Sequence, residues 1–140
     1  MLNIRSTDSY CSSIISLEEK TLTFSNSGQP EILLCRDSKV SFLESLEPRL
    51  PLGMRKNLSY QNSFIKLQKN DTLLFFSDAV TESLNTSGKQ FGYENIISSV
   101  ERYSGGSIQE ICNGLIRDLN SFIQDAGQYD DMTLVGIKIL

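Results

Sequence analysis

The chain has 140 residues, enough for one domain with a substantial core. Hydrophobic residues make up 39% of it and charged residues 21%, as in ordinary globular proteins. The net charge is −4, and the Lys and Arg residues form no basic stripe, which argues against a nucleic-acid partner. The chain has no histidine. This excludes Ser-His-Asp and Cys-His catalysis within the chain and leaves carboxylates, hydroxyls and thiols for any chemistry.

Three features predict a cytoplasmic protein without a membrane segment. The longest apolar runs, residues 32–35 and 73–76, are too short to cross a bilayer. The N-terminus lacks the basic region and apolar core of a signal peptide. Cys11, Cys35 and Cys112 are odd in number and irregular in spacing, so we expect neither a disulfide framework nor a zinc site, which suits a reducing compartment.

The first two-thirds of the chain read as antiparallel strands. Leu22 and Phe24 alternate with Thr and Ser, which predicts a half-buried strand. Residues 11–17 are its expected hairpin partner. A second hairpin is expected from residues 32–36 and 40–43, and a third from residues 61–67 and 72–77, each across a polar turn. Residues 50–54 contain Pro and Gly and predict a turn.

The last third predicts two helices and a returning strand. Apolar residues recur at helical spacing over residues 93–103. Ser107 and Glu110 then match a capping box, followed by an apolar stripe to Ile123, and Ala126-Gly127 is the expected end of that helix. Residues 132–139 predict the final strand. Strands before helices, with a strand returning at the end, predict an α+β fold with an antiparallel sheet covered by helices.

Two acidic positions stand at strand ends. Asp78 directly follows the apolar run at residues 72–77, and Asp130 and Asp131 directly precede the strand at residues 132–139. If these strands are antiparallel neighbours, the carboxylates converge at one rim of the sheet. Clustered carboxylates repel one another unless a cation lies between them, and Mg²⁺ or Mn²⁺ is the natural occupant. The alternative is that each Asp only caps a local turn, Asp78 capping residues 79–84. Spacing alone leaves both interpretations open.

Several segments, in order, resemble phosphatases of the SpoIIE/RsbU type, which are PP2C-like and metal-dependent. FFSDAVTES at residues 75–83 resembles their Asp-Gly-(Val/Ile)-Thr-Glu motif, and QYDDMTLVGIKI at residues 128–139 is similar to their Asp-Asp-x-Thr-Leu strand. LTFSNSGQPEILL at residues 22–34 resembles their Asn-Ala-Gly-His-x-Pro segment. Residues 50–53 and 88–92 resemble a Pro-Leu-Gly turn and a Gly-rich stretch.

The resemblance implies that residues 1–140 are a single partial phosphatase domain, an antiparallel β-sandwich flanked by helices in α/β/β/α layers, with its N-terminal portion missing. It implies hydrolysis of phosphoserine or phosphothreonine in a signalling protein, such as an anti-sigma-factor antagonist, by water that two Mg²⁺ or Mn²⁺ ions activate. By the same resemblance, Asp78 and Asp130 are metal ligands and Asp131 is a supporting neighbour. Asn26, Gly28 and Thr81 are further supporting residues, although a tight turn between strands is the preferred interpretation of Asn26 and Gly28.

Three departures from the family pattern leave two functions open. The carboxylates of the family's upstream Gly-Asp and Asp-x-x-Gly-His-Gly motifs have no counterpart here, Gln29 stands where the family has His, and Ala79 stands where it has Gly. Ala79 costs energy if its φ is positive. The chain is therefore either an enzyme completed by another chain or an incomplete phosphatase-like module that binds a signalling partner. Since a partial sheet exposes edges and faces, we expect a dimer, a companion chain or poor solubility.

Overall fold

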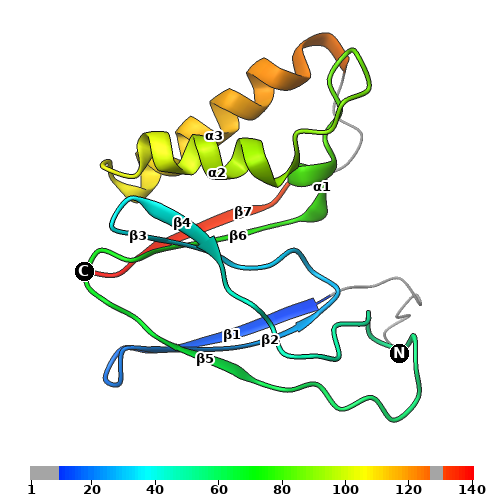
Figure 1. Cartoon of the computed structure of the whole chain (residues 1–140), viewed down its shortest axis with the longest axis vertical. Coiled ribbons are helices and arrows are strands. Elements are labelled where there is room, and N and C mark those ends of the chain that lie inside the picture. Colours follow the sequence, from blue (N-terminus) through cyan, green and yellow to red (C-terminus); the bar gives the residue numbers. More distant parts are fainter. Residues whose placement is uncertain (1–9, 127–130) are drawn as a thin grey trace. The chain divides into compact units, whose positions relative to one another are not determined.

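In a computed structural model of the chain, the structure describes residues 10–126 and 131–140 (Figure 1). The chain divides into two compact units, residues 1–31 with 43–68 and residues 32–42 with 69–140. Each unit contains one antiparallel sheet, and the described helices all belong to the second unit. The α+β fold class predicted from the sequence is confirmed.

The first unit holds a three-stranded sheet in the order β1-β2-β5. The strands are β1 (Tyr10–Ser16), β2 (Thr21–Ser27) and β5 (Ser63–Lys66). The predicted hairpin of β1 and β2 is present, with Ile15 opposite Leu22. Leu22 and Phe24 are buried while their neighbours Thr21, Thr23 and Ser25 are partly exposed, which is the alternation read from the sequence.

The second unit holds a four-stranded sheet in the order β4-β3-β6-β7, with every neighbouring pair antiparallel. Its strands are β3 (Leu33–Arg36), β4 (Lys39–Phe42), β6 (Thr72–Phe76) and β7 (Leu134–Lys138). Its helices are α1 (Asp78–Glu82), α2 (Gly92–Tyr103) and α3 (Ile108–Ile123), followed by the 3-10 turn η1 (Gln124–Ala126). Figure 1 shows α2 and α3 on one face of this sheet.

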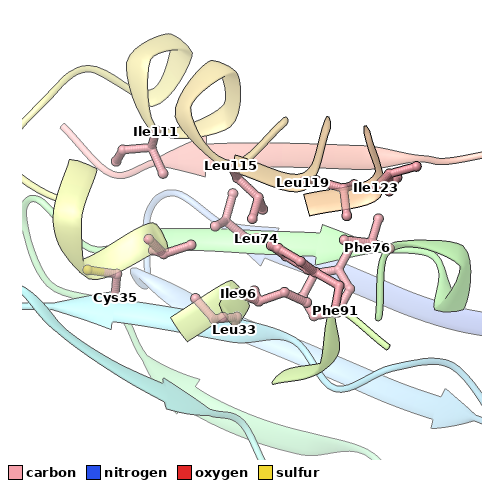
Figure 2. Packing of buried hydrophobic residues seen from close by; sticks show 12 residues of the cluster. Leu33, Cys35, Leu74, Phe76, Phe91, Ile96, Ile111, Leu115, Leu119 and Ile123 are labelled. Atoms are coloured by element: carbon pink, nitrogen blue, oxygen red, sulfur yellow. The ribbon is translucent and has the colours of Figure 1, made fainter. Parts of the chain in front are cut away.

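The core of the second unit lies between that face and the two long helices (Figure 2). Leu33 and Leu74 from the sheet, Ile96 from α2, and Ile111 and Leu115 from α3 are all at most 1% exposed. Burying a side chain of this kind stabilises the fold by roughly 1.5–3 kcal/mol. The apolar stripe predicted along α3 is therefore core.

The third predicted hairpin is wrong, because β5 and β6 belong to different sheets. The hydrogen bonds after β5 explain the change of partner. Leu67 N–H donates to the Lys20 carbonyl at 2.8 Å, which extends the sheet of the first unit. Asn70 N–H donates to the Ile139 carbonyl at 2.8 Å, and Ile139 N–H donates to the Asp71 carbonyl at 2.9 Å. The residues before β6 thus already pair with the end of β7. A polar stretch between two apolar runs suggests a hairpin, but it does not show which strands the two runs pair with.

The predicted capping box of α3 is present, but the helix ends earlier than expected. The Ser107 hydroxyl accepts from Glu110 N–H, and the Glu110 carboxylate accepts from Ser107 N–H. The helix ends at Ile123, where Gln124 takes a positive φ of 51° and continues as a 3-10 turn. Gly127, one of the two expected stop residues, lies outside the described residues. None of the helices in the described ranges is long and apolar enough to span a membrane.

Candidate functional site

The two acidic positions singled out from the sequence lie on neighbouring strands of the second unit. β6 and β7 pair antiparallel, and their last paired residues are Phe76 and Leu134. One residue further, Ser77 N–H donates to the Thr133 carbonyl at 3.0 Å, and Thr133 N–H donates to Ser77 Oγ at 3.1 Å. The end of β6 therefore lies against the start of β7, the arrangement on which the predicted carboxylate rim depended.

Asp78 is the first residue of α1, and its side chain is exposed. Its Oδ1 accepts from Ala79 N–H at 2.9 Å, while its Oδ2 has no hydrogen bond to any described residue. The carboxylate thus makes one local contact, as a turn-capping role would require, and keeps one oxygen for a cation. Ala79 lies within α1 and does not have a positive φ, so the strain considered for this position is absent.

Thr81 fixes the start of the same helix. Its side chain is buried, and its Oγ1 donates to the Asp78 carbonyl at 2.8 Å. At the other end of α1, Ser83 Oγ donates to the Ala79 carbonyl at 2.6 Å. The backbone that carries Asp78 is therefore held by two side chains of its own short helix, and Thr81 stays a candidate supporting residue.

The acidic pair ahead of β7 is only partly described. Asp130 lies outside the described residues, and Asp131 is exposed. Within residues 10–126 and 131–140, no three His, Cys, Asp or Glu side chains come close enough together to hold a metal ion. The oxygen donors of Asp78 and Asp131 are of the kind that Mg²⁺ and Mn²⁺ bind. Mg²⁺ is usually held by one or two carboxylates, and water or substrate oxygens complete its octahedral coordination.

Asn26 and Gly28, the two other predicted site residues, form a tight turn in the first unit. Asn26 is 2% exposed. Its Oδ1 accepts from Gln29 N–H at 2.9 Å, and its Nδ2 donates to the Gln29 carbonyl at 2.9 Å. Gly28 has a φ of 90°, a backbone conformation that favours glycine. These contacts support the turn interpretation of this segment, with Gln29 held through its backbone.

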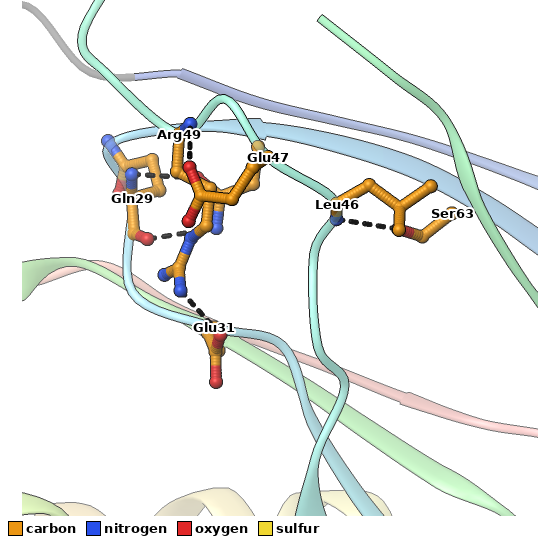
Figure 3. Close-up of polar contacts among 7 residues, drawn as sticks. Gln29, Glu31, Leu46, Glu47, Arg49 and Ser63 are labelled. Atoms are coloured by element: carbon orange, nitrogen blue, oxygen red, sulfur yellow. Dashed lines mark hydrogen bonds and ion pairs between the residues drawn. The ribbon is translucent and has the colours of Figure 1, made fainter.

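Sequence reasoning missed an ion pair next to this turn (Figure 3). Arg49 Nη1 lies 2.7 Å from Glu31 Oε1, and Arg49 N–H donates to Glu47 Oε2 at 3.0 Å. Leu46 N–H donates to Ser63 Oγ at 3.1 Å. The Arg49–Glu31 pair fastens the long loop between β4 and β5 to the segment after β2, and the Leu46–Ser63 bond fastens it to the start of β5. No local pattern signals a pair whose members are 18 residues apart in the sequence.

The three cysteines do not supply an activated nucleophile. Burial is the main cause that raises the pKa of the Cys11, Cys35 and Cys112 thiols above their ordinary value. A reactive cysteine needs the opposite shift, because the thiolate is the attacking species. Cys112 lies on α3 against Gly136 of β7.

Residues 6–140 match the SpoIIE family, described as stage II sporulation protein E. No curated protein sequence matches the chain significantly. The phosphatase domain of the cell fate determinant SpoIIE from Bacillus subtilis has a similar structure, with a TM-score of 0.69 and 20% identity. That match covers 99% of this chain and 61% of the solved domain, so this chain spans less than two-thirds of its length.

Two further solved structures share the fold. The RsbU and RsbW domains of a Mycobacterium tuberculosis protein match with a TM-score of 0.76 and 20% identity, over 94% of this chain and 37% of that one. RsbX in complex with magnesium matches with a TM-score of 0.66 and 16% identity, over 94% of this chain and 56% of that one. Since the family match covers nearly the whole sequence, the chain belongs to the SpoIIE family of PP2C-type phosphatase domains.

Proposed function

We propose that the chain forms part of a metal-dependent phosphatase that removes phosphate from phosphoserine or phosphothreonine in a signalling protein. The observation that carries the proposal is the pairing of β6 with β7, which sets Asp78 beside the segment ahead of β7. That segment contains Asp130 and Asp131. Family membership makes phosphate-ester hydrolysis the reaction to test first.

The proposed cofactor is Mg²⁺ or Mn²⁺, with two ions in a complete site. Asp78 and Asp130 are the proposed ligands, and Asp131 is the proposed hydrogen-bonding neighbour. Among solved relatives, RsbX was obtained in complex with magnesium, and one SpoIIE crystal was presoaked with manganese. A bound divalent ion supplies a water of lowered pKa and neutralises charge on the phosphoryl oxygens. The exposed Oδ2 of Asp78 is the oxygen that this chain offers to it.

We propose that a second copy or a companion chain supplies the remaining ligands. The carboxylates of the family's upstream Gly-Asp and Asp-x-x-Gly-His-Gly motifs have no counterpart in this sequence. Among the described residues, no three His, Cys, Asp or Glu side chains come together to hold an ion. One face of the first unit's sheet also has exposed apolar side chains that a partner would cover. Ile14 is 68% exposed and Phe64 is 69% exposed, and both lie beside Thr23 of β2. A stable, monodisperse monomer in light scattering would contradict this assembly.

The small carboxylate set also favours a second candidate function. In this alternative the chain is a catalytically incomplete phosphatase-like module that holds a signalling partner without hydrolysis. Gln29, which replaces the family's His, is consistent with it because Gln cannot titrate near neutral pH. For either function we propose the same class of partner, a phosphoprotein such as an anti-sigma-factor antagonist.

The deciding experiment is hydrolysis of a phosphoserine peptide by the purified chain, with and without Mn²⁺. The enzyme proposal expects Mn²⁺-dependent release of phosphate that Asp78→Asn and Asp130→Asn each abolish. Asp125→Asn, which changes an exposed carboxylate in η1, is the control and should keep the activity. No hydrolysis and no Mn²⁺ binding by calorimetry would overturn the enzyme proposal for this chain and favour the binding module.

A further inference from the structure

Ser77 lies at the junction between β6 and α1, but its side chain does not cap the helix that it precedes. Ser77 is the N-cap residue of α1, with the extended backbone that a capping serine adopts (φ −76°, ψ 159°). A serine here ordinarily accepts a hydrogen bond from an amide in the first turn of its own helix. The Ser77 side chain makes no such bond. Two other acceptors bind amides of the first turn. Asp78 Oδ1 accepts from Ala79 N–H, and the Ser77 carbonyl accepts from Val80 N–H at 3.1 Å.

The hydroxyl is directed to the neighbouring strand. Ser77 Oγ accepts from Thr133 N–H at 3.1 Å, and Ser77 N–H donates to the Thr133 carbonyl at 3.0 Å. The two residues are 56 positions apart in the sequence, so the contact joins distant parts of the chain. It continues the β6–β7 ladder by one residue beyond its last regular pair, Phe76 with Leu134. A side-chain acceptor takes over at the point where β6 turns into α1.

We propose that Ser77 is a positioning residue whose hydroxyl fixes the start of β7 against the start of α1. This sets the spacing between Asp78 and Asp131, the described residue of the acidic pair. The inference rests on the proposed metal-dependent function, since that function gives the spacing its importance. Asp78 follows Ser77 directly, and Asp131 stands two residues before Thr133. Metal ligands depend on neighbours that orient them, and losing such a neighbour typically weakens metal binding by about 10- to 100-fold.

The test compares Ser77→Ala with Ser77→Thr, which keeps a hydroxyl, and with Ser83→Ala. Ser83 is the matched control because its hydroxyl donates to the Ala79 carbonyl at the far end of the same helix. One readout is the amide exchange rate of Thr133 by NMR, and the other is Mn²⁺ affinity by calorimetry. In Ser77→Ala we expect Thr133 to exchange about five- to tenfold faster, because one hydrogen bond is lost. We expect Mn²⁺ to bind about tenfold or more weakly.

Faster Thr133 exchange with weaker Mn²⁺ binding in Ser77→Ala, and neither change in Ser77→Thr or Ser83→Ala, supports the positioning role. Unchanged Thr133 exchange in Ser77→Ala overturns it, as does an equal loss of affinity in Ser83→Ala. If the unmodified chain binds no Mn²⁺, the metal-dependent function fails for the chain alone, and the Thr133 exchange rate still decides whether the hydroxyl fixes the rim.

Discussion

Arg36, the last residue of β3, forms a bidentate ion pair with Asp71, the residue before β6. Arg36 Nε lies 2.8 Å from Asp71 Oδ1, and Arg36 Nη2 lies 2.6 Å from Asp71 Oδ2. Asp71 is 1% exposed, while the Arg36 side chain is 29% exposed. The hydrogen bonds with Asp71 are the main cause that raises the pKa of Arg36 above its ordinary value. The pair closes the end of the sheet opposite Asp78.

Replacing Arg36 should destabilise the fold strongly. Arg36→Met removes the guanidinium that pairs with the buried Asp71 carboxylate, and we expect the free energy of unfolding to fall by about 3–5 kcal/mol. Urea unfolding followed by circular dichroism measures it. Lys39→Met is the control, because it makes the same change at an exposed cation directly opposite Arg36. The double change Arg36→Met with Asp71→Leu should recover much of the loss, since it leaves no unpaired charge. Equal effects of Arg36→Met and Lys39→Met would contradict the buried pair.

A side chain at Gly114 should disturb the contact between α2 and α3. A Cβ there would lie 2.2 Å from Cδ2 of the Tyr103 ring, so either the ring or the two helices must shift. Alanine favours a helix interior over glycine by about 1 kcal/mol. Even so, we expect Gly114→Ala to lower the free energy of unfolding by about 1–3 kcal/mol through overpacking. Gly105→Ala is the control, because a Cβ there meets nothing within 4 Å. A stabilised Gly114→Ala protein would show that the ring moves aside freely.

The capping box of α3 should make stability depend on pH. The hydrogen bond from Ser107 N–H is the main cause that holds the pKa of Glu110 below its ordinary value. A carboxyl whose pKa is lower when folded contributes stability that is complete above its unfolded pKa. That contribution is lost as the pH falls through the folded pKa. Glu110→Gln keeps an oxygen acceptor but does not titrate, so its melting temperature should fall less between neutral and acidic pH than that of the unmodified chain.

The control for that measurement is Glu94→Gln. Glu94 is an exposed carboxylate in the first turn of α2, a helix whose N-terminus has no side-chain cap. If both variants change the pH dependence equally, the effect does not come from the capping box.

The parts of the fold that follow from local pattern were predictable from the sequence. The alternation around Leu22 and Phe24 gave β2, and the Ser107–Glu110 pattern gave the start of α3. Both depend on residues within a few positions of one another. The pairing partners of β5 and β6 do not depend on nearby residues, because the apolar pattern of each strand is compatible with either sheet. A strand's neighbours are chosen by burial and pairing across the whole chain, and the sequence alone does not reveal that choice.

The candidate site divides in the same way. Asp78 and the Asp130–Asp131 pair stand at strand ends that the apolar pattern reveals, so these positions were predicted. The prediction of a shared rim assumed that the two strands are neighbours, and the pairing of β6 with β7 confirms that assumption. The contact of Ser77 with Thr133 and the pair of Arg49 with Glu31 have no local signature. They join residues 56 and 18 positions apart, where periodicity carries no information.

The turn after β2 gives the last prediction. The buried Asn26 side chain holds both backbone groups of Gln29, so Asn26→Ala leaves a donor and an acceptor without their partners. We expect the free energy of unfolding to fall by about 1–3 kcal/mol, and limited proteolysis to cut faster near Gln29. Asn26→Asp keeps an acceptor for Gln29 N–H but sets a buried carboxylate against the Gln29 carbonyl, so at neutral pH it should not restore the lost stability. Asn62→Ala, at an exposed position of the same unit, is the control. If Asn26→Ala matches that control in both assays, the turn does not depend on this side chain.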